Sequence, residues 1–168
     1  MNDTQNITLL TDFTPEQTKG WALATDRVMG GLSEGRAGIT AIEGGYAARM
    51  FGRVSTANNG GFIQIRTRFE PGMMAGYRGI YLRVLGTDHR YAVHLRNSES
   101  RRPWMNYRHP FSTSGEWEEI YLDFADFQPS RSAMPERLTA ETVFSLGIVA
   151  YGDDFDADLL IDKVGVYR

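Results

Sequence analysis

Apolar and polar residues alternate with a period of two along most of the chain, from residue 35 to the carboxyl terminus, and Gly, Asn and Asp interrupt the pattern repeatedly. This alternation is typical of short β-strands that bury one face. It predicts strands at residues 39–42, 46–54, 61–69, 79–85, 91–97, 117–124, 145–151 and 159–167. Strands in this number, with little helical periodicity, predict an all-β protein folded as a jelly-roll β-sandwich.

Two segments depart from the alternation. A short helix is predicted to begin at Thr14, where Gln17 completes the spacing of a capping box, and to stop at Gly20. Residues 128–141 contain two prolines and several polar residues, so they predict a long connection with a single helical turn. Such a connection joins distant strands in Greek-key sandwiches.

The central strands predict a cationic outer face. Alternation directs these side chains outward: Gln64, Arg66, Arg68, Tyr81, Arg83, His94 and Arg96. If the strands are neighbours, about 4.8 Å apart, four of these residues form one positive platform: Arg66, Arg83, His94 and Arg96. Carboxylates, phosphates or sugar hydroxyls can dock there. The alternative is that the arginines pair with acids of adjoining strands, such as Glu70, Glu118 or Asp123.

A second candidate surface lies in residues 101–108, where aromatic and basic residues interleave. Trp104 and Tyr107 suit stacking on a sugar ring or anchoring a protein partner. The alternative is that this segment is a partly buried edge strand. The sequence leaves both interpretations open.

Size and charge limit the class of protein. The 168 residues fit a single domain, residues 1–168. The net charge is −3, from 18 Lys and Arg against 21 Asp and Glu, so we expect no nucleic-acid partner. No stretch approaches the roughly 20 apolar residues that cross a bilayer, so we expect no transmembrane segment.

The cysteine count and the amino-terminal segment bear on location. Cysteine is absent, which removes thiol catalysis, thiolate metal sites and disulfides. Residues 1–12 are polar and acidic, without the apolar run of a secretory signal or the arginines of a mitochondrial presequence. We therefore expect a bacterial protein with a cytoplasmic location, and the alternative is a chain from which such a segment has already been trimmed.

No residue pattern predicts a catalytic centre, a metal site or a cofactor. Gly30 and Gly31 lack the strand-then-helix context of a phosphate-binding loop. An EF-hand beginning at Asp154 would need Gly in place of Leu159 and Glu in place of Gly165. A structural calcium held by some of the acids at 153, 154, 156 and 158 stays open, and the three histidines lack paired metal-ligand spacing. The chain is therefore predicted not to be an enzyme.

Several stretches share their order and spacing with one known family. They are Trp21, residues 26–33 (Asp-Arg-Val-Met-Gly-Gly-Leu-Ser), 51–55 (Phe-Gly-Arg-Val-Ser), 58–62 (Asn-Asn-Gly-Gly-Phe) and further matches between 79 and 127. The chain thereby resembles the complex I intermediate-associated protein 30 family, in particular its compact bacterial members. The resemblance implies a galactose-binding-like jelly roll, similar to certain carbohydrate-binding modules. It also implies a non-enzymatic assembly factor for respiratory NADH:ubiquinone oxidoreductase.

The shared motifs have two interpretations. In the architectural one, glycines shape turns, Phe51 and Phe62 fill the core, and Asp26 pairs with Arg27 to fix an irregular loop. In the functional one, four residues meet at one rim of the sandwich and contact a ligand or client subunit: Asp26, Arg27, Asn59 and Arg66.

The function predicted from all of this is a binding module for a protein partner, with respiratory complex I subunits as candidates. The alternative is a carbohydrate-binding module that uses the arginine and aromatic face. An enzyme acting on a sugar or an anionic metabolite is the least supported alternative. The candidate binding residues are Asp26, Arg27, Asn59, Arg66, Arg83, His94, Arg96, Trp104 and Tyr107.

Overall fold

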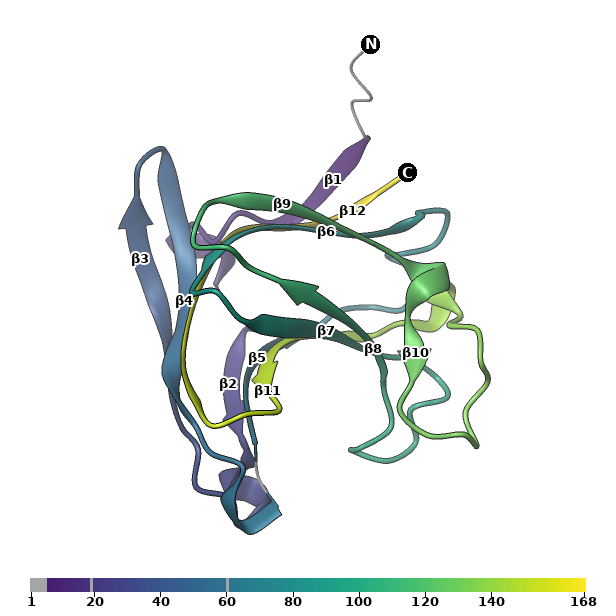
Figure 1. Ribbon diagram of the computed structural model, residues 1–168. Coiled ribbons are helices and arrows are strands. Elements are labelled where there is room, and N and C mark those ends of the chain that lie inside the picture. Colours follow the sequence, from purple (N-terminus) through teal and green to yellow (C-terminus); the bar gives the residue numbers. More distant parts are fainter. Residues whose placement is uncertain (1–5, 19, 60) are drawn as a thin grey trace.

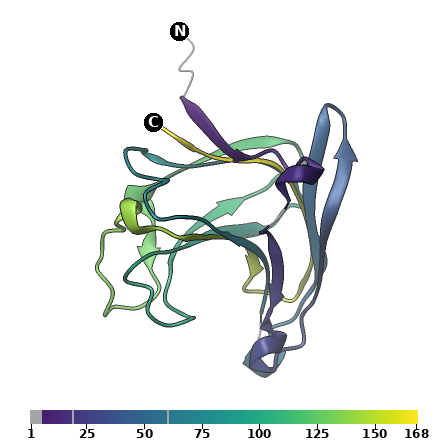
Figure 2. The same cartoon turned by 180° about the vertical axis from the view of Figure 1, so that it is seen from behind.

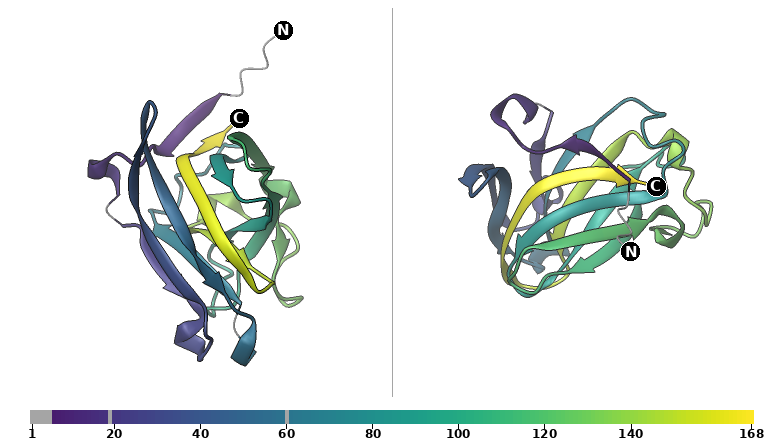
Figure 3. Two further views of the ribbon diagram at one scale, coloured as in Figure 1. Left: turned by 60° about the vertical axis from the view of Figure 1, so that its left-hand side comes forward. Right: turned by 90° about the horizontal axis from the view of Figure 1, so that it is seen from above.

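The computed structural model describes residues 6–18, 20–59 and 61–168, which form two antiparallel β-sheets packed face to face (Figure 1). This confirms the predicted all-β sandwich. The sheet that we call sheet A runs in the order β3 (Glu34–Ile42), β4 (Gly45–Val54), β12 (Phe155–Tyr167), β6 (Gly79–Gly86) and β9 (Glu118–Asp123). One more strand, β1 (Ile7–Thr11), pairs with β12. In the view from above in Figure 3, β12, β6 and β9 curve side by side.

The opposing sheet, sheet B, carries the predicted cationic strands. Its order is β10 (Gln128–Pro129), β8 (Tyr107–Ser112), β7 (Arg90–Arg96), β11 (Ser145–Tyr151), β5 (Phe62–Arg68) and β2 (Ala22–Thr25). Figure 2 shows the two layers from behind, with the β3–β4 hairpin standing at one side. Strands β5 and β7 are not adjacent, because β11 lies between them.

The core lies between the two sheets, as the alternation predicts. Ile63 of β5 and Ile148 of β11 are fully buried on the inner side of sheet B. Leu82 of β6 and Leu159 of β12 are fully buried from sheet A, and all four belong to one apolar cluster. Fully burying a Leu or Ile side chain contributes about 1.5–3 kcal/mol, so this register strongly fixes which face is outward.

Two expected core residues lie outside the core. Met50 and Ile63 are fully buried, so the residues next to them, Phe51 and Phe62, point to the outer faces and are partly exposed. The Arg49 guanidinium lies 4.1 Å from the Phe51 ring centroid. The prediction that Phe51 and Phe62 fill the core is therefore wrong.

Several of the connections contain short 3₁₀ turns. They are η1 (Pro15–Gln17), η2 (Asp26–Met29), η3 (Ala57–Asn59), η4 (Phe124–Asp126) and η5 (Ala140–Thr142). The predicted amino-terminal helix exists as η1, but the Thr14 side chain makes no capping hydrogen bond. The predicted long connection joins β9 of sheet A to β11 of sheet B and contains β10 and η5.

Candidate functional site

The motif at residues 26–33 forms a buried hydrogen-bond network, which we call the Asp26 network. Asp26 is fully buried, and its carboxylate accepts hydrogen bonds from the Ser33 N–H (3.0 Å), the Ser33 hydroxyl (2.5 Å) and the Gly61 N–H (2.5 Å). The Ser33 hydroxyl oxygen in turn accepts one from the Ser55 N–H (2.9 Å). One carboxylate therefore ties η2 to the beginning of β3, the end of β4 and the beginning of β5.

Asp26 stays ionised within the Asp26 network. Burial acts to raise the pKa of Asp26, but the hydrogen bonds from Ser33, Gly61 and Phe62 together outweigh it and hold the pKa below its ordinary value. The Asp26 network also explains why residue 31 is a glycine, because a Cβ there would lie 2.4 Å from the Asp26 carboxyl carbon. Asp26 is thus an architectural residue, and its burial excludes direct contact with a ligand.

The Arg27 side chain does not contact the Asp26 carboxylate. Its Nε donates a hydrogen bond to the Ser33 carbonyl (2.9 Å), and its guanidinium pairs with Glu34 (3.3 Å). The expected Asp26–Arg27 pair is wrong, because the carboxylate of Asp26 is turned inward to backbone N–H groups. Asn59 ends η3, and the placement of its side chain lies outside what the structure describes.

Four arginines gather on the outer side of sheet B, and we call this surface the arginine face: Arg66, Arg68, Arg96 and Arg108. The strand register brings them together. Ser145 of β11 lies opposite both Arg68 and Arg96, and Gly147 lies opposite both Arg66 and His94. His94 is in turn opposite Arg108. In Figure 1 this face looks toward the foot of the picture, between η2 and η3 on one side and the connection after β10 on the other.

No carboxylate neutralises the arginine face within the described ranges. None of the ion pairs found there includes any of its four arginines. Two of the acids expected as partners are engaged elsewhere, because Asp123 pairs with Arg78 and Glu118 accepts a hydrogen bond from Ser114. Burial, and then the positive charges of Arg68 and Arg66, lower the pKa of Arg96. Like charges are therefore held close together.

An aromatic ring and backbone carbonyls hold two of these arginines in place. The guanidinium carbons of Arg68 and Arg96 lie 5.1 Å and 5.7 Å from the centroid of the Phe144 ring. Arg96 also donates hydrogen bonds to the carbonyls of Ser100 (2.9 Å) and Arg102 (3.1 Å). Side chains that are already positioned lose less conformational entropy when they bind a ligand.

His94 belongs to this surface but carries no charge at neutral pH. Burial, and then the nearby Arg108, lower the pKa of His94 to about 3. Its Nε2 is buried and has no hydrogen-bond partner among the described residues, and the same holds for Nε of Arg96. The positive charge of the face thus comes from arginine alone, which corrects the expected charge contribution of His94.

Arg83 does not join the platform. Strand β6 pairs with β12 and β9 in sheet A, so Arg83 lies in the opposite sheet from Arg66 and Arg96. It pairs with Asp162, and its guanidinium carbon lies 4.5 Å from the centroid of the Trp117 ring. The expectation that these strands are neighbours is wrong, because the chain changes sheets between β5 and β6.

The two aromatic candidates differ in exposure. Trp104 is 54% exposed in the connection between β7 and β8, so its ring is accessible. Tyr107 is fully buried in β8, and its hydroxyl donates a hydrogen bond to the Pro135 carbonyl (2.6 Å). Tyr107 is therefore a core residue, and its ring cannot stack on a ligand.

The acids that follow β11, at the turn before β12 and in the beginning of β12, do not converge. Three of them have separate partners: Asp154 with Thr56, Asp156 with Arg53, and Asp158 with Arg49. Within the part of the chain that the structure describes, no three His, Asp or Glu side chains gather as metal ligands.

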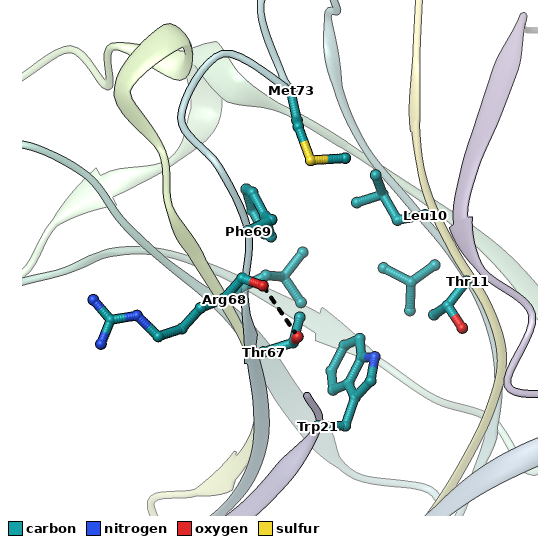
Figure 4. A pocket seen from close by; sticks show the side chains of 9 residues that line it. Leu10, Thr11, Trp21, Thr67, Arg68, Phe69 and Met73 are labelled. Carbon is teal, nitrogen blue, oxygen red and sulfur yellow. Dashed lines mark hydrogen bonds between the residues drawn. The ribbon is translucent and has the colours of Figure 1, made fainter. Parts of the chain in front are cut away.

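A small cavity of about 150 Å³ lies beside the arginine face (Figure 4). Trp21, Phe69 and Met73 point into it, whereas the Arg68 side chain turns away from it. The close-up therefore shows that the consecutive residues Arg68 and Phe69 point in opposite directions, one away from the cavity and one into it.

The two stacked antiparallel sheets form a β-sandwich whose fold is similar to those of several solved carbohydrate-binding modules. The family 11 module of the cellulosomal cellulase Lic26A-Cel5E of Clostridium thermocellum is 13% identical, with a TM-score of 0.76 over 96% of this chain and 94% of that chain. A family 11 module of that organism in complex with a β-1,3-1,4-mixed-linked tetrasaccharide is 12% identical, with a TM-score of 0.76 over 99% of this chain and 97% of that chain. The family 30 module of the cellulase Cel9D-Cel44B is 8% identical, with a TM-score of 0.63 over 100% and 98%. At these identities the likeness shows the fold alone.

The sequence assigns the chain more narrowly. It belongs to the complex I intermediate-associated protein 30 family, whose pattern matches residues 11–161. A comparison with curated proteins gave no significant match. None of the helices in the described ranges is long and apolar enough to cross a membrane.

Proposed function

We propose that this chain is a non-catalytic binding module whose arginine face holds an acidic surface of a partner protein. The observation that carries the proposal is the set of like charges on sheet B, to which no described acid is paired. We propose further, from the family, that the partner is a subunit or assembly intermediate of respiratory NADH:ubiquinone oxidoreductase.

An acidic partner suits the chemistry of this face. A guanidinium presents a planar set of donors that matches a carboxylate, and two parallel hydrogen bonds can form. Burial, and then the charges of Arg68 and Arg66, lower the pKa of Arg96, so part of the free-energy cost of keeping Arg96 charged comes from the neighbouring arginines. A carboxylate placed among them relieves that repulsion, so binding is favoured beyond a single surface ion pair.

The test is affinity capture from native cells with the protein and with the double variant Arg68→Gln/Arg96→Gln. We expect respiratory complex I subunits in the first capture and at least a tenfold lower yield in the second. Arg90→Gln is the matched control, because Arg90 is exposed at the opposite end of β7 from Arg96 and is not one of the four arginines that define the face. Equal yields from the folded double variant, or no complex I subunit in any capture, would contradict the proposal.

A second candidate function is carbohydrate binding. The exposed Trp104 favours it, and so does Tyr151, which lies on the outer side of β11 with its ring 6.4 Å from that of His94. Aromatic rings on the outer side of a sheet suit stacking on sugar rings. A glycan array separates the two candidates: binding that Trp104→Ala or Tyr151→Ala abolishes supports this function, and an array without hits removes it.

A further inference from the structure

A second cationic surface lies at the edge of the sandwich, where the free edge of β2 meets the β3–β4 hairpin. A groove of about 760 Å³ opens there. Its charged lining is Arg27, Glu34, Arg36, Arg53 and Arg66. Four arginines against one carboxylate leave a positive excess in a protein whose net charge is −3.

The charges of this groove are only partly balanced. Arg27 pairs with Glu34, and Arg53 pairs with Asp156 from outside the groove at 3.6 Å. All four of these side chains are more than half exposed, so these pairs are weak and exchangeable. Arg36 and Arg66 have no acidic partner within the described ranges.

The groove also offers apolar surface and free backbone. Leu23 is 39% exposed on one side, and Phe51 is partly exposed on the other. Among the residues that the structure describes, β2 pairs only with β5 and β3 only with β4, so each has one edge without a sheet partner there. Alternate residues of such an edge direct their N–H and C=O groups outward, where an extended chain can bond to them.

We infer that this groove binds an extended acidic segment of a partner protein, one that alternates carboxylate and apolar side chains. The carboxylates pair with Arg36, Arg27 and Arg66, while the apolar side chains cover Leu23 and Phe51. Recognition by a sheet edge takes affinity from main-chain hydrogen bonds and specificity from alternate side chains. The inference does not depend on the arginine face, although Arg66 lies at the boundary of the two surfaces and is left unchanged in the test.

The experiment measures fluorescence anisotropy with a fluorescein-labelled peptide of five Glu-Val repeats. The decisive variant is Arg36→Glu, because Arg36 is exposed and makes no ion pair that folding requires. We expect it to weaken peptide binding at least tenfold, and Arg27→Gln to weaken it severalfold. Arg90→Gln and a Ser-Val peptide are the controls, and a thermal melt verifies that each variant is folded.

Hydrogen exchange locates the bound peptide. We expect added amide protection in residues 22–25 and 34–42. Unchanged affinity in folded Arg36→Glu overturns the inference, and so does protection confined to β7 and β11. The double variant Arg68→Gln/Arg96→Gln separates the two surfaces: it should abolish partner capture through the arginine face while binding this peptide within about twofold of the unaltered protein.

Discussion

At the scale of single residues, the family motif is explained by one buried carboxylate. Asp26 receives hydrogen bonds from segments that are far apart in the sequence, and Gly31 leaves the room that its carboxyl group occupies. The motif could be recognised from the sequence, but its role could not, because Gly61 and Phe62, which also bond to the Asp26 carboxylate, lie 35 and 36 residues further along the chain. A motif that looks like a binding loop here holds separate segments of the fold together.

Replacing Asp26 by Asn should lower the free energy of unfolding by about 3 kcal/mol, because it removes the charge that the buried N–H and hydroxyl donors share. Urea unfolding followed by tryptophan fluorescence measures the change. The control is Asp88→Asn, which alters an exposed acid and should change stability by less than about 0.5 kcal/mol. Equal stability of the two variants would show that the Asp26 carboxylate does not stabilise the fold.

His94 is the second residue whose environment decides its chemistry. In the unfolded chain a histidine takes up a proton near pH 6.5, whereas His94 in the folded protein does so only near pH 3. Between these values the unfolded state binds one proton more than the folded state. Stability therefore falls as the pH is lowered from 6.5 toward 3.

When the pH is lowered from 7.5 to 5.0, the free energy of unfolding of the unaltered protein should fall by about 2 kcal/mol more than that of the His94→Gln variant. The unfolded chain gains a proton below pH 6.5, and the 1.5 pH units from 6.5 to 5.0 contribute about 1.4 kcal/mol each. Urea unfolding at both pH values measures the difference. If His94→Gln shows the same loss as the unaltered protein, His94 is not the neutral residue described here.

At the scale of elements, alternation predicted the strands that bury one clear face and missed those that do not. Strand β2 has only four residues on an edge. Strand β8 contains Pro110, a residue type that argues against a strand. In the described residues, β10 pairs with β8 only at Arg108 and Tyr107, so no strand neighbours that side of β8 at Pro110. Short or edge strands depend on their neighbours in the sheet, and a single sequence does not show those neighbours.

The β3–β4 hairpin offers a paired test of how these elements are specified. Gly52 has φ 141°, and a Cβ there would lie 1.9 Å from the Glu34 carbonyl oxygen, so Gly52→Ala should cost about 3 kcal/mol or more. Gly38→Ala in the same hairpin meets no atom within 4 Å and should change stability by less than about 0.5 kcal/mol. Thermal or urea unfolding distinguishes them, and similar values for both would refute the close approach at Gly52.

At the scale of the whole molecule, charge is separated although the total is slightly negative. The arginine face and the edge groove concentrate positive charge, while acids such as Asp158 and Asp162 pair with arginines of sheet A. The sequence predicted that outward arginines recur, and Arg66 and Arg96 do share one face. It could not predict that Arg83 lies apart, because the assignment of a strand to one sheet or the other depends on long-range pairing.

The pairing of β1 with β12 places the first and the last strand of the described chain side by side. Ile7 lies opposite Tyr167, and the Arg168 N–H donates a hydrogen bond to the Asn6 carbonyl (3.1 Å). Both strands belong to sheet A, whereas the four arginines project from the outer side of sheet B, and Figure 1 shows β1 and the end of β12 at the top of the molecule, away from β7 and β11. A biosensor chip, a fluorescent protein or a neighbouring domain attached next to β1 or after β12 would therefore leave the arginine face unobstructed.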